Sequence, residues 1–166
     1  MWWLFGGVLA LTPGFKHVRT DRLEFDVLRD MAHARVDPHM LHEMATHPFG
    51  AAWGETFTYQ SFQILSADFW QNDDQLVLAL TVKSPSSWPF GHFFDTVKHP
   101  VQFRSFGDRV AMVVGANMQP RIVMSLRGGL IDVVIHRCER SGLSAGLPLF
   151  SHLLQTLRFK DNQPGG

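Results

Sequence analysis

The sequence lacks a second cysteine: Cys138 is the only one in 166 residues, so no disulfide bond can form within the chain. It also lacks a net charge, because 15 basic side chains balance 15 acidic ones. A nucleic-acid-binding protein usually carries a basic excess to neutralise phosphates, so no nucleic-acid partner is expected. Only 18% of the residues are charged, while 12% are aromatic. This composition indicates that part of the surface lies against a partner protein or a membrane.

The start of the chain lacks the run of about 20 apolar residues that a membrane-spanning helix needs. Residues 2–11 are apolar without interruption and include Trp2, Trp3 and Phe5. Tryptophan rings favour the membrane–water boundary, and no basic residue precedes the run, which disfavours a secretory leader. Residues 1–15 are therefore predicted to form a membrane-interface tether or a contact with a partner protein. A buried N-terminal segment and a poorly formed leader are the alternatives.

Three segments carry clear helix signals, and a further short helix is predicted over residues 91–97. Thr20 resembles an N-cap, and the apolar residues after it repeat at helical spacing, which predicts a helix over residues 21–34. Those apolar residues are Leu23, Val27, Leu28 and Met31. Asp37, followed by proline, is a second start signal and predicts a helix over residues 38–47. A stripe of leucines and one phenylalanine predicts a C-terminal helix over residues 146–157.

From residue 56 the pattern changes to strands. Three pairs of alternating apolar stretches flank turns at Asn72-Asp73, Gly107-Asp108 and Gly128-Gly129. Two-residue turns there predict these opposing pairs: Leu65–Leu80, Ala67–Leu78, Phe69–Leu76, Val101–Val114, Phe103–Met112, Met124–Val133 and Leu126–Ile131. Each hairpin then has one apolar face and one mixed face, which agrees with the predicted register.

The predicted fold is α+β. A roughly six-stranded antiparallel meander sheet of three hairpins carries two N-terminal helices and one C-terminal helix. This order of elements is similar to that of the cone-shaped NTF2-like domains, which use two helices, strands, a helix and a long meander. The resemblance covers most of the chain and implies a concave sheet face. Residues 16–160 are expected to form a single domain, followed by a flexible tail at residues 161–166.

Three histidines and a glutamate occur within the stretch DPHMLHEMATHP, residues 37–48. On a helix, His39, Glu43 and His47 recur at every fourth position and share one side, and imidazole and carboxylate groups are zinc ligands. The spacing misses the zinc-hydrolase signature H-E-x-x-H by one residue, and the proline after His47 disfavours helical geometry there. The stretch is interpreted as a solvated polar face, with a metal site as the alternative.

The mixed face of the last predicted strand carries Asp132 and His136, with Ser125 opposite Asp132. Residues four apart on a strand stand about 13 Å apart, too far for the hydrogen bond that a catalytic triad needs between His and Asp. Arg127, a diagonal neighbour, is the expected partner of Asp132. If the sheet curls into a cone, Asp68, Asp132 and His136 are the polar groups expected in its pocket.

Aromatic residues crowd residues 86–100, SSWPFGHFFDTVKHP. Trp88, Phe90, Phe93 and Phe94 either cover the core or form an exposed contact site for a partner. The sequence contains no phosphate-cradling glycine loop, cysteine pair or calcium loop, so no cofactor is expected.

The sequence as a whole predicts a non-catalytic accessory or stabilising subunit of a larger, membrane-associated protein complex. The tryptophan-rich start, the low charge, the aromatic loop and the missing catalytic set favour this function over an enzyme. The alternative is an NTF2-like pocket protein that binds or converts a small apolar ligand, with Asp132 or His136 as a general base.

Overall fold

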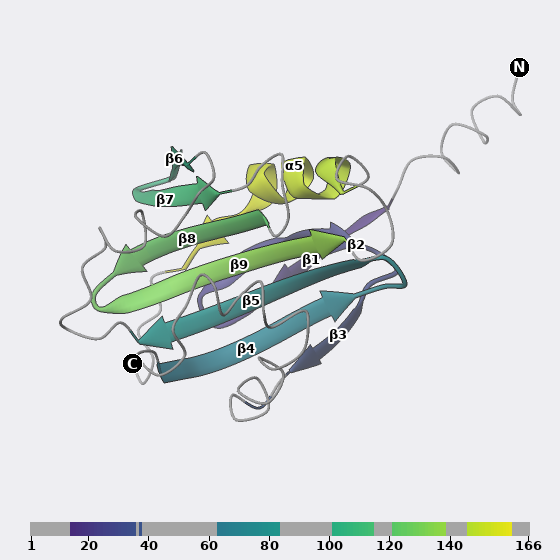
Figure 1. Cartoon of the computed structure of the whole chain (residues 1–166), viewed down its shortest axis with the longest axis horizontal. Helices are drawn as coiled ribbons and strands as arrows, with labels where there is room; N and C mark the ends of the chain where they lie inside the picture. Colours follow the sequence, from purple (N-terminus) through teal and green to yellow (C-terminus); the bar gives the residue numbers. More distant parts are fainter. Residues whose placement is uncertain are drawn as a thin grey trace, which may run out of the picture.

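Two antiparallel β-sheets and one helix make up the protein in the computed structural model, over the residues that it describes (Figure 1). These are residues 14–35, 37, 63–83, 101–114, 121–138 and 146–160. The smaller sheet has three strands and the larger sheet has seven. Within the described residues, no helix has the length and apolar character that crossing a bilayer requires.

The three-stranded sheet has the order β1-β2-β10, with β1 at Phe15–Arg19, β2 at Leu23–Leu28 and β10 at Arg158–Phe159. The strands of the larger sheet are β3 (Ala32–Arg35), β4 (Gln63–Gln71), β5 (Gln75–Lys83), β6 (Val101–Phe106), β7 (Arg109–Val114), β8 (Arg121–Arg127) and β9 (Leu130–Cys138). Their order across the sheet is β3-β4-β5-β9-β8-β7-β6. The helix, α5, spans Leu147–Thr156 and leads directly into β10.

The predicted helix over residues 21–34 is wrong, because this segment forms β2 and β3. In β2, Leu23, Phe25 and Val27 are buried and the residues between them are half-buried, which is the period of a strand. The Thr20 hydroxyl accepts a hydrogen bond from the backbone N–H of Leu23 (3.0 Å). This bond stabilises the β1–β2 turn, so the same side chain that resembles a helix N-cap closes a hairpin instead.

The C-terminal helix predicted over residues 146–157 is confirmed as α5, with Pro148 in its first turn. The helices predicted over residues 38–47 and 91–97 and the tail at residues 161–166 lie outside the described residues. The α+β prediction and its NTF2-like cone are wrong. That arrangement needs two N-terminal helices on one curved sheet, whereas the described chain has two sheets and its single helix near the C-terminus.

The three predicted hairpins are confirmed as β4–β5, β6–β7 and β8–β9. Phe103 lies opposite Met112 and Leu126 lies opposite Ile131, as two-residue turns require. The turn glycines have φ between 61° and 78°, a conformation that a side chain with a Cβ rarely adopts: Gly107, Gly128 and Gly129. These glycine turns therefore determine the registers of β6–β7 and β8–β9, which the sequence predicts correctly.

The register of β4–β5 differs from the predicted one by two residues, because Ala67 lies opposite Leu80 and not Leu78. The turn is centred one residue later than predicted, and three residues, 72–74, separate the two strands. The backbone N–H of Asn72 donates to the carbonyl of Gln75 (3.0 Å), and the Asn72 side chain accepts from the N–H of Gln75 (2.7 Å). A shift of two residues leaves every side chain on its predicted face of the sheet.

The strand order also corrects the predicted meander, because β9 lies between β5 and β8 and separates the first hairpin from the second. Residues 77–82 of β5 and 131–136 of β9 are all buried. Burial on both faces is typical of central strands that pair on both edges. The continuous apolar character of both strands is thus explained by their central place in the sheet.

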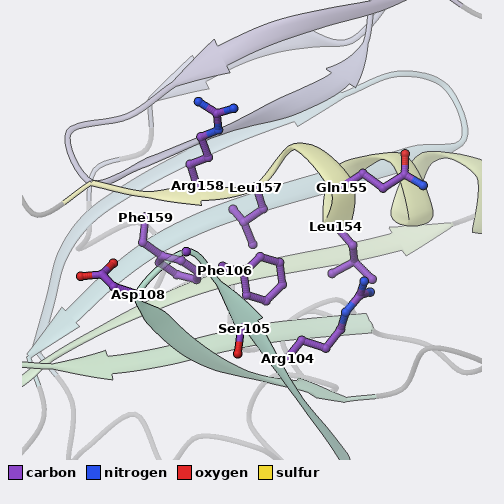
Figure 2. A pocket seen from close by; sticks show the side chains of 10 residues that line it. Arg104, Ser105, Phe106, Asp108, Leu154, Gln155, Leu157, Arg158 and Phe159 are labelled. Atoms are coloured by element: carbon purple, nitrogen blue, oxygen red, sulfur yellow. The ribbon is translucent and has the colours of Figure 1, made fainter.

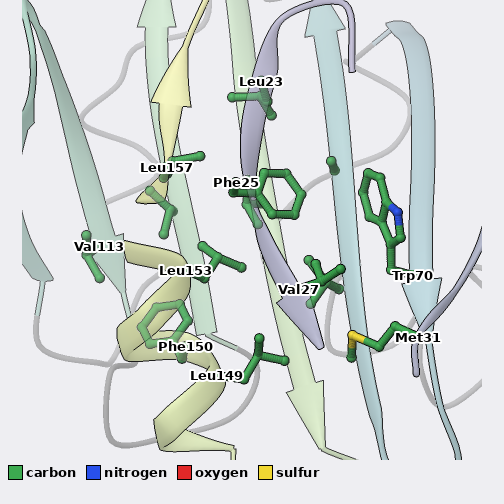
Figure 3. Packing of buried hydrophobic residues seen from close by; sticks show 14 of the residues in the cluster. Leu23, Phe25, Val27, Met31, Trp70, Val113, Leu149, Phe150, Leu153 and Leu157 are labelled. Carbon is green, nitrogen blue, oxygen red and sulfur yellow. The ribbon is translucent and has the colours of Figure 1, made fainter. Parts of the chain in front are cut away.

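The larger sheet buries both of its faces. One face packs against β2 and α5, whose apolar side chains interleave with those of the sheet (Figure 3). That cluster contains Leu23, Phe25, Val27, Met31, Trp70, Val77, Ala79, Ala111, Val113, Val123, Val134, Leu149, Phe150, Leu153 and Leu157. The opposite face carries a second apolar cluster, and all its described members come from the sheet: Ala67, Leu78, Leu80, Val82, Met112, Val114, Ile122, Met124, Ile131, Val133 and Ile135.

Candidate functional site

A buried ionic network centres on Asp132 of β9, which has no exposed surface. Arg22 donates from Nε to Oδ1 (2.8 Å) and from Nη2 to Oδ2 (2.9 Å), a bidentate pair. Thr81 donates its hydroxyl to Oδ1 (3.1 Å), and Arg109 Nη2 reaches Oδ2 at 3.5 Å. Both carboxylate oxygens thus have two protein partners each. The expected partner of Asp132, Arg127, instead pairs with Asp108 at the surface (3.2 Å).

The same network bridges a gap in the sheet between β7 and β8. Among the described residues, these two strands pair only along residues 112–114 and 122–124. Beyond this point Arg109 Nε donates to the Ser125 hydroxyl (3.2 Å), and that hydroxyl donates to the carbonyl of Val110 (3.0 Å). Side chains therefore replace the backbone ladder where the β6–β7 hairpin separates from β8.

A second buried group centres on His136, at the opposite end of the described part of β9. Arg121 Nη1 lies 3.2 Å from Nδ1, and Nε2 lies 2.9 Å from Gln75 Oε1. Arginine only donates, so Nδ1 accepts, and Nε2 carries the proton that it donates to Gln75. Burial and the charge of Arg121 lower the pKa of His136 to about 3, against an opposing effect of Asp74. The ring is neutral and too weakly basic to act as a general base near neutral pH.

Close packing around Gly146 holds this group in place. A Cβ at Gly146 would lie 2.6 Å from His136 Cε1 and closer still to the buried Cys138 thiol. Real Cβ atoms do not approach other atoms this closely, so only glycine fits before α5. His136 also stacks on Phe150 of α5, with 5.9 Å between ring centroids. The geometry is that of a packed interior.

Asp68, the third polar residue predicted for a pocket, lies on β4 on the same sheet face as Asp132 and His136. It is buried and pairs with His33 Nε2 (2.9 Å), whose ring stacks on Trp70. The structure places the three predicted residues on one face but in three separate hydrogen-bonded groups. None of them lines the cleft described below.

A fourth polar group, at the surface, joins the smaller sheet to the helix. Asp26 of β2 lies between His17 Nδ1 and His152 Nε2, each 2.8 Å from one carboxylate oxygen. Burial raises the pKa of Asp26, but the hydrogen bonds from both histidines outweigh it, so the pKa is lowered overall. Phe15 stacks on His152. No group of three or more His, Cys, Asp or Glu side chains in the described ranges is arranged to hold a metal ion.

A cleft of about 490 Å³ opens between the β6–β7 hairpin and the segment that runs from α5 into β10 (Figure 2). Its lining comes from two stretches, residues 104–108 and 154–159. Phe106 and Phe159 meet edge to face at its centre, with ring centroids 5.8 Å apart. Sequence reasoning missed this site, because no local signal joins the turn at Gly107 to a two-residue strand about fifty positions away.

The other predicted contact and metal residues lie outside the described residues: Trp2, Trp3, Phe5, His39, Glu43, His47, Trp88, Phe90, Phe93 and Phe94. Their roles stay predictions. No protein-family model, curated protein or solved structure matches this chain.

Proposed function

We propose that this protein is a non-catalytic accessory subunit that docks to a partner protein in a larger assembly. The observation that carries the proposal is an apolar surface patch at one end of the larger sheet. Phe103 is 63% exposed, Val110 59% and Leu126 43%. We call these three residues the apolar patch.

The members of the apolar patch share one face of the sheet. Phe103 lies opposite Met112, Val110 is two positions before Met112, and Leu126 is two positions after Met124. All three therefore continue the buried cluster of that face, to which both methionines belong, out to the surface. Exposed apolar side chains that extend a core in this way favour burial against another protein.

The buried polar groups support a non-catalytic role. Asp132 has four contacts with protein groups, and His136 is held neutral with both ring nitrogens hydrogen-bonded. A general acid or base needs access to a substrate and a pKa near the working pH. Both residues are fully buried, and the pKa of His136 is lowered to about 3, so we assign both to the stability of the fold.

Leu126→Ser is expected to weaken association with the partner about ten-fold or more, because burial of a leucine contributes roughly 1.5–3 kcal/mol. The measurement is the native size of the protein extracted from its own cells after gentle membrane solubilisation. Leu65→Ser is the matched control, since Leu65 is a strand leucine with 40% exposure in a bulge of β4, outside the patch. Wild type and Leu65→Ser should migrate together in the larger assembly.

Two results would contradict this proposal. Wild-type protein that runs alone near its mass of 18.8 kDa would rule out the assembly. Equal migration of Leu126→Ser and wild type in one assembly would rule out the apolar patch as the docking surface.

We further propose that residues 1–15 attach this subunit to a membrane surface. The support is the apolar run with Trp2 and Trp3, since tryptophan rings favour the membrane–water boundary. Deletion of residues 2–11 is expected to move the protein from the membrane fraction to the supernatant in a flotation assay. The charge-neutral comparison is Trp2→Leu with Trp3→Leu, which keeps an apolar run and should weaken binding less. A deletion variant that still floats with the membranes would refute the tether.

A further inference from the structure

The cleft between the β6–β7 hairpin and the α5–β10 segment has the size of a small-molecule site. Its volume of about 490 Å³ lies within the roughly 300–1,000 Å³ typical of such sites. It opens on the α5 side of the sheet, because Arg104 lies opposite Ala111, which packs against α5 and β2. The apolar patch lies on the other side, so this site is independent of the docking surface.

The base of the cleft is apolar and already built. Phe106, Leu154 and Phe159 are half-buried and pack against the core, and Leu157 is buried below them. The Phe159 ring is fixed from two directions. Its ring meets Phe106 edge to face, and the guanidinium carbon of Arg109 lies 4.9 Å from its centroid. A flat or branched apolar body would find a preorganised surface here.

The charge at the mouth of the cleft is positive. Two arginines, Arg104 and Arg158, and one carboxylate, Asp108, line it. Asp108 pairs with Arg127 (3.2 Å), whereas neither lining arginine forms an ion pair within the described part of the chain. Figure 2 shows the Arg104 side chain extending from β6 toward Leu154, while Arg158 points to the side of β10 away from the two rings. Arg104 is therefore the cation available to a ligand in the cleft.

We propose that this cleft binds a small amphiphilic carboxylate, an organic anion with an apolar body. The body would pack against Phe106 and Phe159, and the carboxylate would accept hydrogen bonds from the Arg104 guanidinium, which matches carboxylates in a planar, two-pronged geometry. A phosphate ester fits less well, because phosphate sites usually combine several cations or backbone N–H donors. Arg109 at the base is buried and paired with Asp132, so the one exposed guanidinium in the cleft, that of Arg104, matches a single negative charge.

The test is a titration of the full chain with 2-naphthoate, followed by ¹H–¹⁵N NMR, with neutral 2-naphthalenemethanol as the uncharged counterpart. Saturable shifts should concentrate at residues 104–108 and 154–159. Arg104→Gln should weaken naphthoate binding about ten-fold, the effect of one charge-assisted hydrogen bond, and leave binding of the alcohol unchanged. Arg158→Gln is the matched control and should change the naphthoate affinity little. Both arginines are exposed, so equal urea midpoints should verify that the variants fold.

Three results would overturn the proposal. One is the absence of saturable shifts at the cleft, and another is equal naphthoate affinity in Arg104→Gln and wild type. The third is tighter, competing binding of a blocked peptide of alternating glutamate and phenylalanine, which would make the cleft a site for a protein segment. Each can occur whether or not Leu126→Ser disrupts the assembly, so this proposal and the docking proposal fail separately.

Discussion

Asp132→Asn should lower the free energy of unfolding by about 3–5 kcal/mol, the usual effect of removing one partner from a buried ion pair. The substitution keeps the shape of the side chain but removes the negative charge that two buried arginines share. Arg22 then retains a positive charge in the interior with its bidentate partner lost. Urea-induced unfolding followed by tryptophan fluorescence gives the change, since the chain has five tryptophans.

The matched control is Asp108→Asn, which neutralises an aspartate paired with Arg127 at the surface. Exposed pairs of this kind contribute at most about 1 kcal/mol. The contrast between the two variants isolates the effect of burial, because each removes one carboxylate charge from an arginine. Equal stabilities of Asp132→Asn and wild type would mean that the ionic network around Asp132 does not stabilise the fold.

Acid should destabilise the fold through His136 as the pH falls below 6.5. Its pKa is 6.5 in the unfolded chain and about 3 in the folded protein, so between these values the unfolded state binds the extra proton. Stability therefore falls as the pH drops below 6.5. The linkage relation gives a loss of about 2 kcal/mol by pH 5 and about 3 kcal/mol by pH 4.

Urea unfolding between pH 7 and pH 4 measures this loss. His136→Asn should flatten the pH dependence in this range, because the asparagine oxygen can accept from Arg121 without taking up a proton. His33→Asn, at a half-exposed histidine, is the comparison variant, because it keeps His136 and therefore the pH dependence that His136 causes. Asp26 does not account for a loss of stability in this pH range. Its pKa in the folded protein is lowered from 3.8, so its contribution to the free energy of unfolding is present above pH 3.8 and is lost as the pH falls below that value. A pH dependence that survives in His136→Asn would contradict the assignment.

Local chemistry explains which parts of the fold the sequence predicts. The turns at Gly107 and at Gly128-Gly129 demand positive φ, and alternation on both sides sets the register, so the second and third hairpins are correct. The turn after Gln71 has no such glycine, and the Asn72 side chain organises it instead by accepting hydrogen bonds from the N–H groups of Asp74 and Gln75. The register there is displaced by two residues as a result.

The helix prediction for residues 21–34 is wrong for a different reason. Leu23, Val27 and Met31 fit a helical period, while Leu23, Phe25 and Val27 fit a strand period equally well. Pairing of β2 with β1 and with β10 decides between them, and β10 places Arg158 opposite Glu24, 134 positions apart in the chain. Propensity within the segment cannot supply that information.

The candidate site depends on the same long-range contacts. Asp132 and His136 are correctly placed on one face by period-two alternation. The partner of Asp132 is Arg22, 110 positions away, and no spacing rule joins them. The cleft arises only when β10 brings Phe159 beside Phe106.

The insertion of β9 beside β5 has a consequence for the order of events at the ribosome. Thr81 and Asp132 face each other across the central pair although 51 positions separate them. The β4–β5 hairpin therefore leaves the ribosome with one edge of β5 unpaired. That edge stays unpaired until β9 has been synthesised. Closing so long a loop is slow. During that interval the edge of β5 is open to pairing with other nascent chains, so yield on expression should depend on chaperones that shield strand edges.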